Sequence, residues 1–295
     1  MPSERQIKMT ATTVNSAKAW APDVQAFLPS DVIPEALIFQ AATVVTQELE
    51  GDAPVARIPW IDDAAAEFVA EGAEIDEAEP ELAETIVATG KISQLIPVSR
   101  EQFGQNGTAN LLSESVRRAI VKRANEAFIA QVAPAEGKLT PPEGILTQAA
   151  WQTEAGSGVG TITDNLDPLA LTLALVESNG ATPSQLIMSP NAWAMLRTLK
   201  TGEGSAQSLL GAGTEDADKR LLGLPVITTP AVTEDQILIV DRTAIPAAVG
   251  NIIIAQSEHA YFSSDRIALR ATWRIGWKVA HPNRLAVLDV NIPGA

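Results

Sequence analysis

The side chains that could do chemistry in this sequence are two histidines, a dense run of acids and a series of arginines. Histidine transfers protons near neutral pH and is a common metal ligand. The chain has no cysteine, and neither His259 nor His281 stands in a metal-binding spacing such as H-E-x-x-H. A lone histidine is usually structural, and His281 before Pro282 indicates a turn at the end of a strand.

The glycine-rich and acidic segments offer no better catalytic pattern. Residues 156–160 are rich in glycine but lack the lysine and the strand-to-helix setting of a phosphate-binding loop. The sequence contains no G-x-S-x-G nucleophile elbow. Carboxylates are abundant, but so dense a run gives no reason to choose one pair as acid and base. The sequence therefore predicts no enzyme, and no catalytic, metal-binding or cofactor-binding residue.

The densest charge lies at residues 62–84, where ten acids occur without a lysine or an arginine. Such a run repels itself and cannot form a core alone. Apolar residues such as Phe68 and Ile75 interrupt it, and strand-like segments at 55–61 and 85–98 flank it. Two interpretations remain open: a solvated acidic loop, or a two-stranded excursion that reaches another surface. The acids are Asp62, Asp63, Glu67, Glu71, Glu74, Asp76, Glu77, Glu79, Glu81 and Glu84.

A long strand predicted at residues 266–280 carries the complementary charge. Residues two apart share one face of a strand, and the alternation here continues over 15 residues, whereas strands usually have about 5–6. One face is apolar, with residues such as Trp273 and Ile275. A strand of this length suits an extended scaffold better than a compact pocket. The cations of the other face, called the basic ridge below, are Arg266, Arg270, Arg274 and Lys278.

Composition restricts the classes of function. The 295 residues suffice for one large or two ordinary domains, and the net charge of −15 argues against binding through a phosphate backbone. No segment approaches the roughly 20 apolar residues of a membrane span. Residues 1–9 are polar and predict no secretion signal.

The remaining pattern predicts a mixture of helices and strands. Residues 1–28 have no sustained periodicity and predict an arm, while residues 31–49 begin as a helix and end in a stretch that a strand would also explain. A long amphipathic helix is predicted at 108–131. Without regular β-α-β units the fold class is α+β. Further helices are expected at 167–179 and 190–202, and strands at 185–188, 225–229, 237–240 and 247–256.

Six segments in sequence carry a resemblance to a known family. They are Ile58-Pro59-Trp60 with residues 67–73, 91–92 and 98–99; the helix at 108–131; residues 142–146; residues 186–193; Leu221-Leu222-Gly223-Leu224-Pro225-Val226; and residues 266–276. In this order they resemble the major capsid protein of tailed bacteriophages, the family typified by phage Hong Kong 97. The segment 221–226 is the most specific match, and the resemblance covers about residues 30–290.

The resemblance implies a Hong Kong 97-like capsid fold. It places an N-terminal arm and lead-in at residues 1–50 and an extended acidic loop at 51–98. A peripheral domain, with a long spine helix and the long strand, would combine 99–160 with 250–295. An axial domain would comprise 161–249.

The resemblance also implies a structural role in the virion. Copies would associate as pentamers and hexamers into an icosahedral shell that encloses double-stranded DNA without sequence-specific binding. Expected partners are other copies, a separate scaffolding protein, a portal and a decoration protein, with no membrane. Assembly would take place in the cytoplasm of the host bacterium.

Two departures from the family pattern matter. Some members begin with a scaffolding region of about a hundred residues, for which the sequence has no room, so scaffolding is expected from a separate protein. The type member crosslinks a loop lysine covalently to an asparagine of another subunit. Residues 58–90 contain no lysine here, and Lys91 lies at the base of the loop. We therefore expect a shell without covalent crosslinks.

The acidic and basic segments suggest how neighbouring subunits meet. The hypothesis is that the acidic loop of one subunit lies on cations of the next, either the basic ridge or a cluster on the long helix. The candidate acids are Glu71, Glu74, Asp76, Glu77, Glu79, Glu81 and Glu84. The candidate cations are Arg117, Arg118, Lys122 and Arg123 on the helix, and Arg266, Arg270, Arg274 and Lys278 on the ridge.

Three other functions stay open at this stage. An encapsulin, a bacterial compartment of the same fold, would package a cargo enzyme in place of DNA. A soluble acidic enzyme would show a pocket of carboxylates with perturbed pKa values. A minor structural or decoration protein would bind a shell without forming one.

Overall fold

The computed structural model describes most of the chain between residues 24 and 292. The predicted arm before residue 24 and the centre of the acidic run, residues 63–80, lie outside the described residues. The described ranges are 24–27, 33, 35–46, 55–62, 81–103, 108–148, 160–202, 207–210, 219–232 and 235–292.

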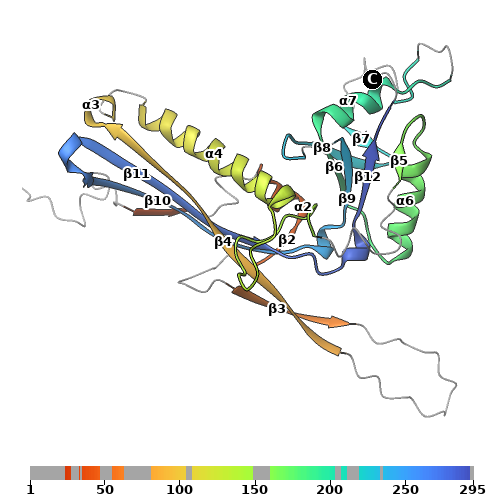
Figure 1. Ribbon diagram of the computed structural model, residues 1–295, viewed down its shortest axis with the longest axis horizontal. Helices are drawn as coiled ribbons and strands as arrows, with labels where there is room; N and C mark the ends of the chain where they lie inside the picture. Colours follow the sequence, from red (N-terminus) through yellow and green to blue (C-terminus); the bar gives the residue numbers. More distant parts are fainter. Residues whose placement is uncertain are drawn as a thin grey trace, which may run out of the picture.

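The first sheet forms the elongated lobe of the molecule (Figure 1). Its strands lie in the order β1-β10-β11-β4-β3, and β2 pairs beside β10. All pairings are antiparallel except that of β2 with β10. The strands are β1 (Val24–Phe27), β2 (Thr43–Thr46), β3 (Val55–Asp62), β4 (Glu81–Ser99), β10 (Pro246–Tyr261) and β11 (Arg266–Trp277).

Strand β4 serves two pairings in succession. Its residues 89–99 pair with β11, and its residues 81–88 pair with β3. The second pairing is a two-stranded ribbon that projects from the sheet (Figure 1). The predicted two-stranded excursion is therefore confirmed for residues 55–62 and 81–88, although the returning strand starts four residues earlier than the predicted residue 85.

Strand β11 has the predicted alternation but is shorter than expected. Leu269 is half-buried, and Ile267, Ala271, Trp273, Ile275 and Trp277 are buried on one side. The strand ends at Trp277, not at the predicted residue 280, because its partner β10 begins at Pro246 and offers no further strand to pair with. Lys278 therefore follows the strand and is not part of it.

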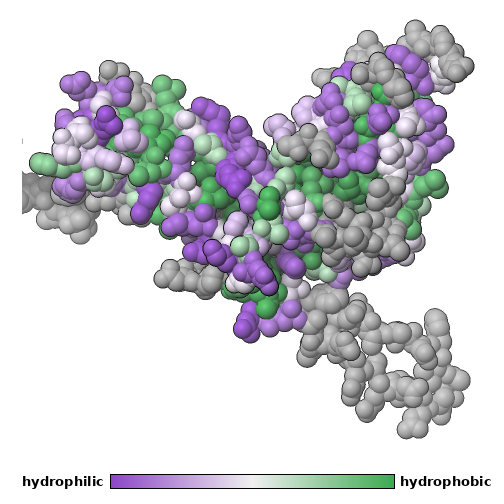
Figure 2. Space-filling model, in the orientation of Figure 1, coloured by the Kyte–Doolittle hydropathy of each residue, from purple (hydrophilic) through white to green (hydrophobic). Residues whose placement is uncertain are grey.

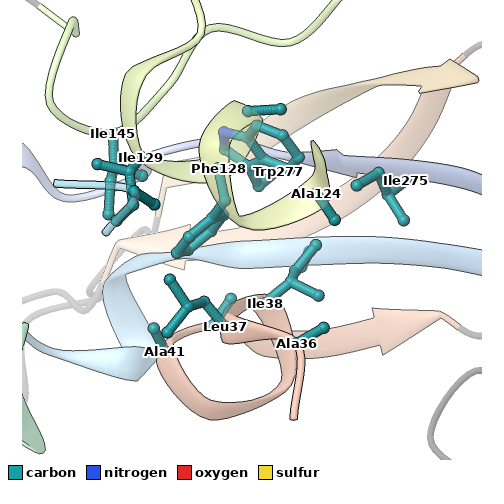
Figure 3. Close-up of a cluster of buried hydrophobic side chains, with 14 of the residues drawn as sticks. Ala36, Leu37, Ile38, Ala41, Ala124, Phe128, Ile129, Ile145, Ile275 and Trp277 are labelled. Atoms are coloured by element: carbon teal, nitrogen blue, oxygen red, sulfur yellow. The ribbon is translucent and has the colours of Figure 1, made fainter. Parts of the chain in front are cut away.

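Helix α4 (Thr108–Ala130) covers one face of the first sheet and confirms the predicted long helix. Its apolar stripe includes Val116, Ile120, Ala124 and Phe128, all buried, at the helical spacing of three or four residues. Phe128 meets Trp277 edge to face, with ring centroids 5.3 Å apart (Figure 3). Full burial of each large apolar side chain stabilises the folded state by about 1.5–3 kcal/mol. These residues belong to the first hydrophobic core, which therefore holds the helix on the sheet.

The lead-in to β2 packs against the same core. Helix α2 (Leu37–Ala41) buries Leu37 and Ile38 close to α4 (Figure 3). The segment 31–49 thus contains one helical turn followed by a strand, which resolves the ambiguity of its sequence. A second short helix, α3 (Arg100–Phe103), follows β4 and was not predicted.

The second sheet lies in the other lobe (Figure 1). Its strands lie in the order β5-β12-β9-β6-β8-β7. Strands β6 and β8 pair in parallel, and a helix connects them in the sequence. Alternate residues of its central strands belong to different cores: Ile187 joins the first core, whereas Leu186 and Met188 join a second core. The strands are β5 (Thr161–Ile162), β6 (Gln185–Met188), β7 (Arg220–Leu221), β8 (Leu224–Thr228), β9 (Gln236–Val240) and β12 (Ala286–Val290).

Helices α6 (Asp167–Ser178) and α7 (Pro190–Thr198) supply the second core with Leu169, Val176 and Leu196. Helix α7 begins as predicted: the hydroxyl of Ser189 accepts a 2.9 Å hydrogen bond from the N–H of Ala192. It ends at Thr198, earlier than the predicted residue 202.

The sheets divide the chain differently from the proposed domain boundaries. Strand β12 lies within 250–295, which was expected with the first sheet, yet it pairs with β9 and β5 of the second sheet. Its alternating burial suits that position, and the 3-10 turn at Pro282–Arg284 redirects the chain after β11. Two further 3-10 turns lie at Arg242–Ala244 and Phe262–Ser264.

Candidate inter-subunit surfaces

The basic ridge lies on the face of the first sheet that α4 leaves open. Directly opposite residues of paired strands share a face, and β11 places Arg270 opposite Leu95 and Arg274 opposite Lys91. Leu95 is 54% exposed and Arg270 is also exposed. Since the neighbouring Trp273 and Ile275 are buried toward α4, these cations point away from the core.

The open face has an excess of positive charge. Arg274 and Lys91 face each other, and like charges directly opposite are destabilising. Arg274 donates from Nη1 to the hydroxyl of Thr89 at 3.3 Å, which is a neutral partner. Among the described residues no carboxylate forms an ion pair with any cation of the basic ridge. The face therefore suits an anionic partner from another chain.

Arg100, which sequence analysis did not identify, stabilises one end of the open face. It forms ion pairs with Asp265 at 3.0 Å and with Glu258 at 3.4 Å. Hydrogen bonds to Asp265 and then Glu258 raise the pKa of Arg100. These contacts tie the β10–β11 turn to the end of β4. Their partners lie more than 150 residues apart in sequence, so no local pattern indicated them.

Part of the cation cluster on α4 forms ion pairs within the subunit. Arg117 donates to Glu35 at 2.6 Å and thereby ties α4 to the segment before α2. Partial burial alone would raise the pKa of Glu35, but the hydrogen bond and charge of Arg117 hold this pKa below its usual value. Lys122 lies 3.9 Å from Glu126. Arg118 and Arg123 form no ion pair with a described residue.

The structure describes only two of the candidate acids. Glu81 and Glu84 lie in β4, within the ribbon, and Glu84 forms an ion pair with Arg57 at 3.6 Å. Both side chains of this pair are well exposed, so it contributes little to stability. The other candidates lie outside the described residues: Glu71, Glu74, Asp76, Glu77 and Glu79.

Two hollows open beside α4. One, of about 360 Å³, lies between the end of α4, the middle of β4 and the prolines Pro141 and Pro142. The other, of about 530 Å³, lies between α4 and the segment 229–231 that follows β8; Figure 2 shows the notch between the two lobes of the molecule. Both are lined by a mixture of apolar and charged side chains. The second hollow has two carboxylates in its lining, and both are near cations: Glu35 pairs with Arg117 at 2.6 Å, and Glu126 lies 3.9 Å from Lys122.

The two histidines lie at a turn and near a strand end. His281 precedes a 3-10 turn, as predicted, and His259 is exposed near the end of β10. The described residues include no group of three side chains that could hold a metal ion. Within the described ranges no helix is long and apolar enough to cross a membrane.

This combination of features defines a class of protein. The long helix on a sheet with one open charged face, and the projecting ribbon, are typical of a subunit that packs against other chains. The class is a structural subunit of an assembly. The phage capsid family matches residues 22–290, nearly the whole chain, and the protein belongs to that family.

Solved structures agree with this fold. A structure from Microbacterium phage Oxtober96 has a TM-score of 0.67 at 13% identity and covers 95% of this chain and 99% of its own. A structure from Gordonia phage Cozz has a TM-score of 0.63 at 16% identity, with coverages of 99% and 98%. The capsid of a native GTA particle has a TM-score of 0.64 at 15% identity, with coverages of 98% and 95%. No curated protein matches the chain.

Family and fold together establish the broad function. The fold is the Hong Kong 97-like capsid fold, and the protein is a structural, non-enzymatic capsid shell protein. Membership of the phage capsid family also places it in the virion, in association with other copies of itself. The enzyme reading is not favoured.

Proposed function

We propose that this chain is a major capsid subunit that associates as pentamers and hexamers, which close into an icosahedral shell around double-stranded DNA without covalent crosslinks. The observation that carries this proposal is the ribbon of β3 and β4. It projects from the first sheet, and at its start β4 changes partner from β11 to β3. A feature that leaves its own subunit is expected to contact a neighbour.

The ribbon supports the proposal through its exposure. An isolated two-stranded ribbon is marginally stable in water, because it buries too little apolar surface. Ile86 in the ribbon is 49% exposed, and Leu95 further along β4 is 54% exposed. Both large apolar side chains would lose contact with water if the ribbon and the open face lay against another copy.

The charges indicate which two surfaces would meet in this contact. The acidic run of one subunit would lie on the basic ridge of its neighbour, because the ridge cations have no described carboxylate partner. The helix cluster contributes less, since Arg117 is held by Glu35. Exposed ion pairs are worth about 0–1 kcal/mol each, so the shell depends on many repeated contacts and is sensitive to salt.

The further partners follow from the same proposal. A separate scaffolding protein would guide assembly in the host bacterial cytoplasm, a portal would occupy one vertex, and a decoration protein would bind outside. The net charge of −15 supports a shell that encloses DNA without gripping its phosphates.

The first experiment is light scattering with negative-stain microscopy on the purified chain, expressed alone and with a scaffolding protein. Closed shells, or rings of five and six, would support the proposal. A persistent monomer or dimer under both conditions would overturn it and favour an accessory protein. Nuclease-protected DNA inside the particles, in contrast to a packaged cargo protein, separates the phage shell from an encapsulin.

A further inference from the structure

The hairpin of β7 and β8 turns through two residues in the left-handed region of the backbone. Leu221 pairs with Leu224, so the turn consists of Leu222 and Gly223. Their φ angles are +49° and +83°. A two-residue turn with positive φ at both positions matches the twist of the strands that it joins, and the sequence Asn-Gly is strongly preferred there. Leucine is disfavoured in this conformation, because its Cβ crowds the neighbouring carbonyl.

Leu222 is unfavourable to the unassembled subunit in two ways. Its backbone is strained, and its large apolar side chain is 49% exposed. Among the described residues the other non-glycine residue with positive φ is Asp265, a residue type that tolerates this conformation. Residues held in strained conformations cluster at sites that bind other molecules. Leu222 is therefore a candidate for a contact that the single subunit does not contain.

The base of the hairpin is held firmly by the second lobe. Leu221 and Val226 are buried in the second core. The N–H of Val226 donates to the carbonyl of Lys219 at 2.7 Å, and Nζ of Lys219 donates to the hydroxyl of Thr228 at 2.9 Å. The turn is thus presented in one conformation, and a pre-organised group loses little conformational entropy when it binds.

Helix α6 exposes a second leucine near the opposite edge of the same sheet. The second sheet ends in β7 at one edge and in β5 at the other. Helix α6 packs beside β5 and β12 and buries Leu169 and Val176 in the second core (Figure 1). Its outer side carries Leu171, which is 72% exposed, and Ala174, which is also exposed. The second lobe therefore exposes a large apolar side chain near each of its two sheet edges.

We propose that Leu222 of one copy packs against Leu171 on the outer side of α6 of the next copy. This contact joins two different surfaces of the same subunit and is therefore head-to-tail, and head-to-tail contacts form closed rings when their rotation closes. The inference rests on the proposed function, because pentamers and hexamers need a contact of this type. It names the residues that would make it.

A second copy is the occupant that the structure favours. Six strands separate the two edges of the sheet by five spacings of about 4.8 Å, or about 24 Å, so Leu222 cannot reach Leu171 of its own chain. Membership of the phage capsid family establishes association with other copies. Contact between the two leucines would remove both exposed side chains from water.

The first test replaces Leu222 and compares stability with assembly. Leu222→Asn should raise the thermal midpoint of the unassembled subunit by about 2 °C, because Asn-Gly relieves the strained turn. The same variant should need a roughly tenfold higher subunit concentration to form rings or shells, measured by light scattering across a dilution series with scaffolding protein. The control Leu139→Asn removes a leucine that is 60% exposed in the loop after α4, and it should assemble like the wild type.

The second test examines the receiving surface. Leu171→Gln retains a good helix former and should weaken assembly by a similar factor. When both changes are made in one chain, the defect should be about that of one variant alone, because a contact between two residues is lost only once. Circular dichroism checks that Leu171→Gln is folded; if it is not, Leu171→Ala takes its place with the same expected direction.

Each outcome decides the inference. Normal assembly of Leu222→Asn, an equal defect in Leu139→Asn, or defects of the two leucine variants that multiply in the double variant would overturn it. A lowered thermal midpoint in Leu222→Asn would also overturn it, because the side chain would then stabilise its own subunit. Failure of the wild type to form rings or shells with scaffolding protein would instead overturn the proposed function itself.

Discussion

The two sheets of the molecule use their faces differently. In the second sheet, β6 is buried along its whole length, because Ile187 packs into the first core and Leu186 into the second. In the first sheet, β11 buries Trp273 on one side and leaves Arg270 exposed on the other. A sheet covered on both faces is completed within one chain, whereas we propose that the open face of the first sheet is covered by another chain.

The amino-acid composition of the strands reflects this difference in burial. A strand buried on both faces is a continuous apolar run, as in Ile237–Val240, whereas a strand with one open face alternates. The open face does not carry the mixed charges of an ordinary solvated surface. Its cations gather without described carboxylate partners, which is the property expected of a surface that binds an acidic neighbour.

The largest expected effect comes from the covered face of the first sheet. Trp273→Ala should lower the free energy of unfolding of the unassembled subunit by about 3–5 kcal/mol, because it leaves a cavity and removes the bond from Nε1 to the carbonyl of Gly250. Urea unfolding followed by fluorescence or circular dichroism measures it. Leu95→Ala on the open face is the control and should change stability by about 0.5 kcal/mol or less. Similar losses in the two variants would contradict the distinction between the faces.

The next effect concerns the point where the ribbon leaves the sheet. A Cβ added at Gly276 would lie 2.2 Å from the carbonyl oxygen of Ala88, at the change of partner in β4. Gly276→Ala should therefore cost about 1–3 kcal/mol by forcing the backbones apart. Gly202→Ala is the matched control, because nothing lies within 4 Å of its added Cβ. An unchanged urea midpoint for Gly276→Ala would show that β4 can shift at this point without cost.

Local sequence pattern predicted the elements with strong periodicity. The alternation of β11 and the apolar stripe of α4 each repeat over many residues, so the faces that they bury could be assigned before the structure was known. The same alternation identified the ridge residues Arg266, Arg270 and Arg274. The end of β11 could not be predicted, because it depends on where the partner strand β10 begins.

The contacts that decide which cations are free were beyond local pattern. Whether Arg117 is available depends on Glu35, which is 82 positions away. Lys91 joins the open face through the register of β4 with β11, and the residues of that pair are also far apart in sequence. For the same reason β12 could not be assigned to the second sheet, since a short alternating strand fits either sheet.

A smaller effect tests whether Arg117 is committed within the subunit. Glu35→Gln should lower the thermal midpoint at neutral pH by about 1–2 °C, because exposed pairs contribute little. The pKa of Glu35 is lowered below 4.5 in the folded state, so its contribution is complete above that pH and is lost as the pH falls through the lowered value. The difference from the wild type should therefore shrink on acidification. Glu136→Gln, at an exposed loop position, is the control and should leave the thermal midpoint at neutral pH unchanged.

The smallest effect on the subunit should accompany a large effect on assembly. Arg270→Glu with Arg274→Glu reverses two cations of the open face and touches neither core, so the free energy of unfolding should change by about 0.5 kcal/mol or less. Shells should nevertheless form poorly, because the acidic run of a neighbour would then meet like charge. Light scattering and negative-stain microscopy measure this, beside the control Lys138→Glu with Lys200→Glu.

The salt dependence of shell assembly is a second test of the same variant against the wild type. The Debye length falls from about 10 Å at 0.1 M to about 3 Å at 1 M ionic strength, so the defect of the reversed chain should narrow as salt screens the repulsion, while wild-type assembly weakens. Normal shells from the reversed chain at low salt would remove the basic ridge from the contact. The open face of the first sheet would then have to bind its neighbour through apolar side chains such as Leu95, and assembly would strengthen with added salt instead.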